Sequence, residues 1–259
     1  MIFKKVKSND PYVVDTCLTK HYLHRTPSIK YAFVAYEDET ENPLGMITFS
    51  TPQFPSVLMS ICNNKVATHD NTMELSRLYV EQWAREEYKN LASQIVSKAI
   101  RWFKPMNKII YSYSDRGAED SKLGAIKSDY KHQGYIYQAC NFWFCGVAKG
   151  SFKAYNGLGK RGGNWVKGRK YRFVIYPNNK NRYIYVAGDK RFKRLVRQNL
   201  KHKPEPYPKG DEMEYTIGDM SVGTERFILD RQTGDTYKES DFIHTKLYKE
   251  YFIDTDMYS

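Results

Sequence analysis

Residues 73–80 read MELSRLYV, and residues 91–103 read LASQIVSKAIRWF. The first run is typical of a strand. In the second, four apolar residues recur at helical spacing and share one face: Leu91, Ile95, Ala99 and Trp102. A strand that leads into an amphipathic helix is a building block of α/β proteins. This stretch therefore predicts an α/β (α+β) fold.

The segments on either side extend this pattern. Toward the N-terminus, the sequence predicts a helix over residues 10–24 and a hairpin of strands at 31–36 and 44–50. Toward the C-terminus, the expected elements are a buried strand at 109–113, a short helix within 114–134, a long aromatic strand at 135–145, strands at 171–176 and 182–188, a helix at 189–200, hairpins near Asp219 and Asp235, and a terminal helix. The order up to residue 145 resembles the GNAT acyltransferase fold, a mixed sheet flanked by helices. The later elements would form a basic β/α extension.

Charge divides the chain into three parts. The 259 residues carry 41 Lys and Arg against 29 Asp and Glu, for a formal net charge of +12. Residues 149–209 hold 18 basic and 2 acidic side chains, whereas residues 211–259 hold 5 and 12. A segment that basic is what a polyanion-binding surface requires. We therefore expect a GNAT-like catalytic domain over 1–148, a basic extension over 149–210, and an acidic tail over 211–259 packed on the domain.

Several protein classes are excluded by composition. Hydrophobic residues make up 41% of the chain and aromatic residues 15%, so a core can form and disorder throughout is ruled out. No apolar run approaches the roughly 18 residues of a membrane span, and the N-terminus MIFKKVKSND is neither a signal nor a transit peptide. The four cysteines lack zinc-knuckle spacing and are expected to be reduced thiols. We expect a cytoplasmic protein that makes no membrane contact, with the oligomeric state open and a homodimer possible.

Local strings point to a more specific resemblance. They are KHYLHRTP at 20–27, ELSRLYV at 74–80, NLAS at 90–93, YSYSD at 111–115, HQGYIYQACNFWFCG at 132–146, and a basic segment from 182 that closes in PYPK at 206–209. Together these strings resemble the Mom family of phage DNA-modification proteins over about residues 1–209. The resemblance implies an enzyme that converts adenine in double-stranded DNA, at its exocyclic amine, to a carbamoylmethyl (glycinamide-like) adenine. DNA modified in this way resists host restriction enzymes.

The resemblance also implies an iron cofactor. By matching motifs, its candidate ligands are His21 and Tyr22 of KHYL, Asp115 of YSYSD and Tyr137 of GYIYQ. A histidine, a carboxylate and a phenolate oxygen suit non-haem iron. Other roles stay open for each: a capping or surface position for His21, core packing for Tyr137, and a helix N-cap for Asp115. His132 is a further catalytic candidate, as a general base, a further ligand or a turn residue.

The donor of the transferred group is expected to bind near Arg77, Asn90 and Ser93, which match the family's positions for an acyl donor. An acyl-CoA or another small molecule fits this expectation. The equivalent of the GNAT pyrophosphate loop is AREEYKNLAS, which has no glycine and places Glu86 and Glu87 near the expected phosphates. Ordinary acetyl-CoA binding is therefore in doubt, and Asn90 and Ser93 either bind an anion or cap the helix.

The basic residues divide into a loop and a helix that we expect to contact DNA. The loop residues are Lys160, Arg161, Lys167, Arg169 and Lys170, and the helix residues are Lys190, Arg191, Lys193, Arg194, Arg197 and Lys201. No acid lies among the helix cations to relieve their repulsion, although a merely solvated helix is the alternative. We expect Phe192, Leu195, Val196 and Leu200 to pack this helix. Reaching a paired adenine requires base flipping, so Tyr135, Phe142 or Trp143 would stack on the base or pack in the core.

Two competing functions stay open on the sequence alone. One is a conventional acetyl-CoA-dependent acetyltransferase that acts on a protein or a small molecule. The other is a DNA-binding protein without catalysis, which would use the basic segment alone.

Overall fold

The computed structural model describes residues 1–21, 25–38, 42–115, 134–158, 171–175, 179–209 and 226–253, without the side chain of Asp115. The chain forms two compact units. Unit 1 comprises Met1–Ser114, Gln133–Gly146 and Asn181–Asp211, and unit 2 comprises Asp115–His132, Val147–Lys180 and Glu212–Ser259. Among the described helices, none is both long enough and apolar enough to cross a bilayer.

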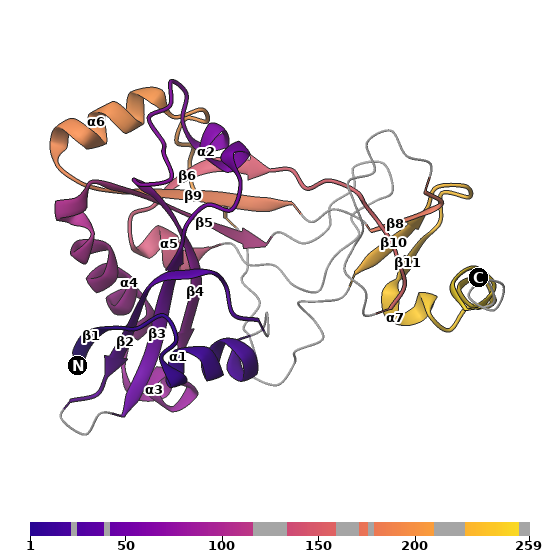
Figure 1. The fold of residues 1–259 in the computed structure, drawn as a ribbon, viewed down its shortest axis with the longest axis horizontal. Helices are drawn as coiled ribbons and strands as arrows, with labels where there is room; N and C mark the ends of the chain where they lie inside the picture. Colours follow the sequence, from indigo (N-terminus) through magenta and orange to yellow (C-terminus); the bar gives the residue numbers. More distant parts are fainter. Residues whose placement is uncertain are drawn as a thin grey trace. The chain divides into compact units, whose positions relative to one another are not determined.

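A seven-stranded mixed sheet organises unit 1 (Figure 1). Its strands lie in the order β1 (Ile2–Val6), β2 (Ile29–Tyr36), β3 (Pro43–Ser50), β4 (Thr72–Val80), β5 (Lys108–Asp115), β9 (Lys180–Ala187) and β6 (Trp143–Ala148). The pairs from β1 to β4 are antiparallel, and β4 and β5 are parallel. Strand β9, from late in the chain, therefore lies between β5 and β6.

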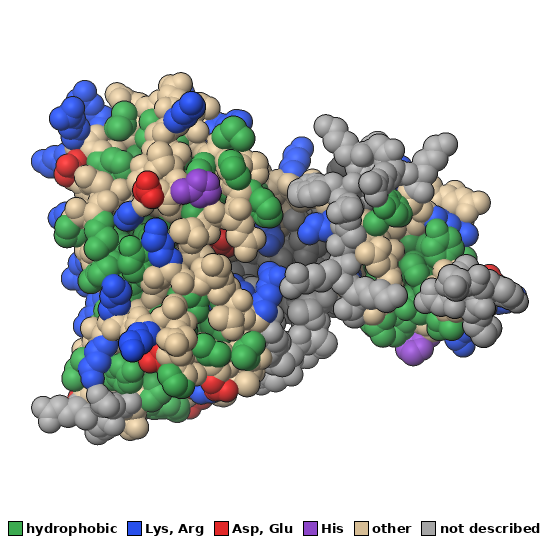
Figure 2. Space-filling model, viewed as in Figure 1, with side chains coloured by type: hydrophobic (Ala, Val, Ile, Leu, Met, Phe, Trp, Pro, Cys, Tyr) green, Lys and Arg blue, Asp and Glu red, His purple; other side chains and the backbone are tan. Residues whose placement is uncertain are grey.

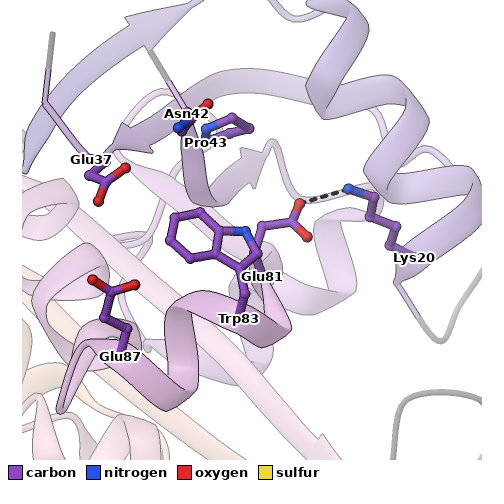
Figure 3. Close-up of a pocket in the computed structure, with 7 residues that line it drawn as sticks. All are labelled: Lys20, Glu37, Asn42, Pro43, Glu81, Trp83 and Glu87. Atoms are coloured by element: carbon purple, nitrogen blue, oxygen red, sulfur yellow. Dashed lines mark hydrogen bonds and ion pairs between the residues drawn. The ribbon is translucent and has the colours of Figure 1, made fainter. Parts of the chain in front are cut away.

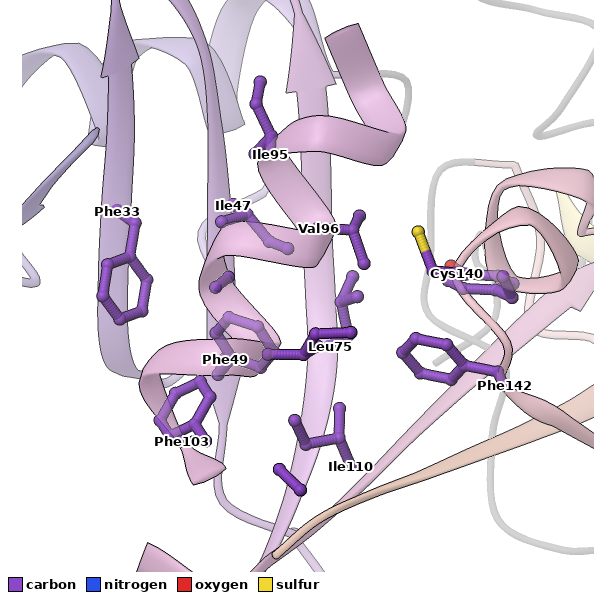
Figure 4. Close-up of a cluster of buried hydrophobic side chains, with 14 of the residues drawn as sticks. Phe33, Ile47, Phe49, Leu75, Ile95, Val96, Phe103, Ile110, Cys140 and Phe142 are labelled. Atoms are coloured by element: carbon purple, nitrogen blue, oxygen red, sulfur yellow. The ribbon is translucent and has the colours of Figure 1, made fainter. Parts of the chain in front are cut away.

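Helices cover both faces of this sheet. They are α1 (Pro11–Asp15), the π-helix η1 (Thr16–Lys20), α2 (Pro55–Ile61), α3 (Gln82–Glu87), α4 (Leu91–Trp102), the 3-10 turn η2 (Lys104–Met106), α5 (Tyr135–Ala139) and α6 (Lys190–Asn199). On one face, Ile95 and Val96 of α4 pack on Ile47, Phe49 and Leu75 (Figure 4). Each such buried side chain contributes about 1.5–3 kcal/mol relative to an exposed one. The helix that the apolar spacing predicted is thus the main cover of this face.

The opposite face carries two separate clusters. Helices α2 and α6 cover β5 and β9, with Ile61 and Val196 among the buried residues. Val13 of α1 and Cys17 of η1 pack instead on β2, β3 and β4. Side chains are therefore buried on both faces of the sheet, as expected for a sheet that lies between two layers of helices.

The predicted mixed α/β fold is confirmed, with one local error. Residues 135–145 do not form a single strand, because Tyr135–Ala139 is the helix α5 and β6 begins only at Trp143. Asn141, with φ 60°, turns the chain between them. The aromatic run indicated a strand, but aromatic residues also suit a short buried helix when tertiary contacts favour it. Strand β1 and the helices α2 and α3 were not predicted, and the expected short helix within 114–134 and hairpin near Asp219 lie outside the described residues.

Unit 2 is built around a four-stranded sheet in the order β11 (Thr236–Lys238), β10 (Phe227–Asp230), β8 (Phe173–Ile175) and β7 (Lys153–Ala154). Its neighbouring strands are antiparallel. Helices α7 (Glu239–Phe242) and α8 (Lys246–Phe252) supply Phe242 and Tyr248 to a core that includes Tyr155, Phe173 and Ile228. The C-terminal segment therefore completes a sheet with strands from the basic segment.

The two units do not follow the three charge segments expected at 1–148, 149–210 and 211–259. Residues 181–211 belong to unit 1, because β9 takes a central place in its sheet. Residues 212–259 belong to unit 2, because β10 pairs with β8. The charge of a segment thus describes its surface, whereas the pairing of its strands determines to which unit it belongs.

An ion pair with a buried carboxylate links β10 to the residue directly before β8 in unit 2. The side chain of Asp230 has no exposed surface, and Arg172 donates to it from Nε and from Nη2, the latter at 2.9 Å to Oδ2. Burial alone would raise the pKa of Asp230, but the hydrogen bonds from Arg172 and from the Gln232 N–H outweigh it, and the pKa is lowered. A lowered folded-state pKa adds stability above the unfolded pKa of about 4, which is lost as the pH falls through the folded value.

We expect Asp230→Asn to lower the free energy of unfolding by about 2–3 kcal/mol at pH 7, because Arg172 loses its buried counter-ion. The penalty should shrink as the pH falls below about 4, because Asp230 of the unfolded wild type then takes up a proton before Asp230 of the folded protein does. Urea unfolding of the full chain, followed by circular dichroism at pH 7 and pH 3, measures both effects. The exposed Asp241→Asn is the control. Equal stability of wild type and Asp230→Asn at pH 7 would contradict the role of the pair.

Candidate functional site

Arg77 lies on β4 with 6% of its surface exposed. Its Nη2 donates to the carbonyl oxygen of Arg25 at 3.2 Å, and its Nη1 donates to the carbonyl oxygen of Ser76. Burial raises the pKa of the Cys17 thiol, and the positive charge of Arg77 opposes this shift. Arg77 therefore lies close to η1 and fixes the chain at Arg25, four residues after His21.

His21 directly follows the π-helix η1. Its N–H donates to the carbonyl oxygen of Thr16 at 2.8 Å, which closes the wide turn of a π-helix. Single π-helical turns are frequent at functional sites. His21 is only 6% exposed, so the alternative of a surface histidine is wrong. The structure thus places a buried histidine at the end of η1.

Glu81 is a site residue that the sequence did not reveal. Its Oε1 accepts from the Tyr12 hydroxyl at 2.8 Å and from Lys20 Nζ at 2.7 Å, and Tyr79 donates to its Oε2 at 3.5 Å. Burial, followed by the bond to Glu81, raises the pKa of Tyr12. Because Lys20 immediately precedes His21, Glu81 ties the end of η1 to the end of β4. The only sequence signal for it was its position directly after a strand.

A surface pocket of about 560 Å³ opens beside this residue (Figure 3). It is lined by Lys20, Glu37, Asn42, Pro43, Glu81, Trp83 and Glu87. Tyr88 donates to Glu37 at 2.7 Å, and this bond raises the pKa of Tyr88 to about 12. Three carboxylates against one lysine disfavour an anion in the pocket. The pocket next to α3 is therefore unsuited to a pyrophosphate, in line with the expectation from Glu86 and Glu87.

Asn90 and Ser93 lie at the start of α4. Asn90 adopts the left-handed conformation with φ 59°, and its side chain makes no capping bond. Ser93 Oγ donates to the carbonyl oxygen of Asn90 at 2.8 Å. The capping alternative therefore fails for the Asn90 side chain, whereas the Ser93 hydroxyl bonds within the first turn. Their role at a donor site stays a prediction.

Tyr137 of α5 is in the core of unit 1 and is 7% exposed. A hydrogen bond of 2.8 Å joins its hydroxyl to Ser112 Oγ on β5, and its ring lies 5.1 Å from the ring of Tyr183 on β9. A Cβ on Gly134, which has φ 79°, would lie 2.5 Å from the Tyr183 ring, so glycine is required there. The structure thus gives Tyr137 a packing role, and its role as a metal ligand stays a prediction.

The remaining catalytic candidates fall outside the described residues. These are Tyr22, His132 and the side chain of Asp115, although β5 ends at Asp115 as expected. Within the described ranges, no three His, Cys, Asp or Glu side chains lie close enough to hold a metal ion. His21 and Tyr137 alone do not make an iron site, and the iron cofactor therefore stays a prediction.

Helix α6 presents a cationic surface, defined by Lys190, Arg191, Lys193, Arg194, Arg197 and Lys201, all of them exposed. Figure 2 shows Lys and Arg side chains gathered where α6 lies at the upper left. Within the part of the chain that the structure describes, no salt bridge engages these cations. Asp189 is used instead as the N-cap and accepts from the Phe192 N–H at 2.7 Å. The helix therefore offers its charge to solvent or to an external anion.

The aromatic and apolar neighbours of α6 divide between surface and core. Val196 and Leu200 are buried as expected, but Leu195 is 46% exposed and does not pack the helix. Arg197 lies over the ring of Trp143 at 5.9 Å. Phe142 is fully buried and Tyr135 is 42% exposed. The loop cations Lys160, Arg161, Lys167, Arg169 and Lys170 lie outside the described residues.

The fold and the site define a mixed α/β protein with a cationic surface on one helix. Among solved structures, the chain is similar to NAA60 from Arabidopsis thaliana, crystallised with a bisubstrate analogue (9% identity, TM-score 0.41, 71% of this chain and 97% of that chain). It is also similar to a ribosomal-protein-S5-alanine acetyltransferase from Vibrio fischeri (12% identity, TM-score 0.38, 71% and 92%). Similarity at this level carries no argument about activity.

The sequence comparison is more specific. Residues 9–209 match the model of the Mom protein family, and the chain belongs to this family. The predicted family resemblance is thereby confirmed over most of the chain. A comparison with curated protein sequences finds no match.

We expect Glu81→Gln to destabilise the η1 end of unit 1, because the half-buried Tyr12 hydroxyl and Lys20 lose a charged acceptor. Hydrogen bonds to charged groups contribute about 1.5–3 kcal/mol, and partial exposure places the loss near the lower value. Hydrogen exchange of the amides in residues 11–21 is the measurement. Glu86→Gln, on the helix α3 that follows Glu81, replaces an exposed carboxylate; it is the control and should leave exchange unchanged. Unchanged protection in Glu81→Gln would remove Glu81 from this role.

Proposed function

We propose that this chain is a phage-type DNA-modifying transferase that converts adenine in double-stranded DNA to carbamoylmethyl adenine and so protects the DNA from restriction enzymes. The match of residues 9–209 to the Mom family carries the proposal. The exposed cations of α6 support it, since they offer a surface for the phosphate backbone within the matched region. The conventional acetyltransferase is the second candidate.

The chemistry places two demands on the protein. The exocyclic amine of adenine is a poor nucleophile, because its lone pair is delocalised into the ring, and the paired base must leave the helix before it can react. We assign contact with the phosphate backbone of the DNA to α6. The flipped adenine is then free to enter unit 1. Arg77, Asn90 and Ser93 are assigned to the donor of the carbamoylmethyl group, an acyl-CoA or another small molecule. The carboxylates beside α3 favour a donor without a pyrophosphate in that pocket.

Iron belongs to this proposal with His21, Tyr22, Asp115 and Tyr137 as its ligands, and His132 as an additional catalytic residue. When bound, iron supplies Lewis-acid or redox activation of a bound reactant. The buried position of His21 supports its assignment as a ligand, because imidazole nitrogen is a common ligand of non-haem iron. The metal content of purified His21→Ala, relative to wild type, tests the assignment independently of activity.

We expect mass spectrometry of nucleosides from plasmid DNA to reveal a heavier adenine nucleoside in cells that express this chain. His21→Ala and Tyr22→Ala should abolish it, because both are assigned to the reacting centre. His69→Ala, an exposed histidine, is the matched control and should retain it. Unmodified adenine in the presence of folded wild-type protein would contradict the proposal. Measurable acetyl-CoA binding would then favour the acetyltransferase, and DNA binding alone would favour a non-catalytic protein.

We expect neutralisation of α6 to flatten the salt dependence of DNA binding. Each phosphate contact contributes a slope of about 0.9 in log K against log salt. Replacing Lys190, Lys193 and Arg197 with glutamine should therefore reduce the slope by up to about 2.7. Fluorescence anisotropy with a labelled duplex between 50 and 200 mM salt, about the range in which such effects are large, measures it. Lys7, Lys30 and Lys104, exposed elsewhere in unit 1, form the control triple. An unchanged slope removes α6 from the interface.

A further inference from the structure

Three buried polar atoms lie on two neighbouring strands of unit 1 and have no hydrogen-bond partner within the described part of the chain. They are Oγ of Ser114 on β5, and Oδ1 and Nδ2 of Asn181 on β9. Ser114 is 1% exposed and Asn181 is fully buried. An unsatisfied buried donor or acceptor destabilises the folded protein, so a pair of such residues needs an explanation.

The topology brings these residues to the same end of the sheet. Strands β5 and β9 are neighbours. Asn107, directly before β5, accepts from the N–H of Asp189, two residues after β9. The beginning of β5 therefore lies beside the end of β9, and the two strands are antiparallel. It follows that Ser114, near the end of β5, lies beside Asn181, near the beginning of β9.

The same two residues also share a face. Ser112 on β5 bonds to the Tyr137 hydroxyl, and the Tyr137 ring lies against Tyr183 on β9, so Ser112 and Tyr183 face α5 together. Side chains alternate along a strand, so residues two positions apart point to the same side. Ser114 and Asn181 are two positions further toward one end of the sheet. They therefore continue the face on which Tyr137 lies.

We propose that Asn181, with Ser114, binds the hydrogen-bonding edge of the target adenine. An asparagine amide presents one acceptor and one donor side by side. Adenine presents the complementary pair, its N6 amine as donor and an adjacent ring nitrogen as acceptor, which is why asparagine is a frequent partner of this base. Asn181 Oδ1 accepts from N6, Nδ2 donates to the ring nitrogen, and Ser114 adds a hydroxyl beside them.

This assignment rests on the proposed function and adds its specificity. The bond from N6 to Oδ1 uses one of the two amine hydrogens and leaves the other to be replaced. Because the two side chains are buried, the low local dielectric strengthens both hydrogen bonds. It also makes the binding of a base that cannot form them unfavourable. Cytosine also presents an amine beside a ring acceptor but is smaller, whereas guanine and thymine present a carbonyl where adenine presents its amine. Asn181 is thus a binding residue that selects and orients the base.

The test uses Asn181→Leu in the full chain. Leucine has the same branched arrangement of four side-chain heavy atoms as asparagine but no polar atom, so the variant removes the orphaned amide with little change of shape. The probe is a fluorescent duplex with one unpaired adenine, compared with the same duplex carrying an abasic site. Wild type should prefer the adenine by about tenfold, within the range of a bidentate contact. Asn181→Leu should lose this preference and retain its affinity for the abasic duplex.

Two further variants keep the test decisive. Ser114→Ala should weaken the preference and serves as the second readout if the leucine variant does not fold. Thr236→Val is the matched control, because Thr236 Oγ1 is also a buried atom without a partner but lies in unit 2. It should leave the preference intact.

The outcomes separate the two proposals. If wild type and both site variants show the same preference for adenine, the assignment of Asn181 and Ser114 is overturned and the proposed function stands. If wild type shows no preference, the assignment is likewise overturned. Absence of modified adenine in plasmid DNA from cells that express wild type overturns the proposed function instead. A duplex with 1-deazaadenine or 7-deazaadenine identifies the ring nitrogen, because only one substitution should abolish the preference.

Discussion

The place of β9 between β5 and β6 is the constraint on which unit 1 depends. A central strand must satisfy the hydrogen-bonding groups of two neighbours, and an unpaired edge inside a sheet would leave many of them buried without partners. Here that strand comes from residues 180–187, after both of its neighbours in the chain. Helix α6 follows it directly, so the cationic surface is attached to the centre of the sheet. Tyr183 of the same strand packs against Tyr137, which links this surface to the face with the predicted site.

Charge of opposite sign occupies different elements of unit 1. Carboxylates of Glu37, Glu81 and Glu87 line the pocket beside α3, whereas α6 is cationic. A polyanion is attracted to the second surface and repelled by the first. The acidic pocket therefore disfavours a polyanion at this surface, and Glu81 in addition holds η1 against β4 through Tyr12 and Lys20.

The sequence predicted those parts of the fold that periodicity and charge determine. The hairpin of β2 and β3, the strands β4 and β5, and the helices α4 and α6 lie where their patterns indicated. Residues 135–145 were misjudged because the same aromatic residues suit a strand and a short buried helix. The pairing of β9 with β5 could not be predicted from the sequence, since contacts between distant strands leave no local pattern.

The residues of the candidate site were likewise predicted only in part. Motifs singled out His21 and Tyr137, and the structure adds that both are buried. No sequence motif singled out Glu81, Ser114 or Asn181. Their importance follows only from the residues that surround them in the folded chain. Exposure also could not be inferred: helical spacing placed Leu195 among the packing residues of α6, but the helix contacts the sheet along a narrower stripe centred on Val196.

The late position of β9 has a consequence for synthesis on the ribosome. Strands β1 to β5 can pair as they emerge, but β6 must wait for a partner that is translated more than 30 residues later. Contacts between residues so far apart in sequence form slowly, because the loop must close before any bond rewards it. During that interval β5 and β6 expose open edges, which favour pairing with other chains. Rapid translation of residues 149–187 would shorten this period, and a chaperone bound to the nascent chain would cover the open edges during it.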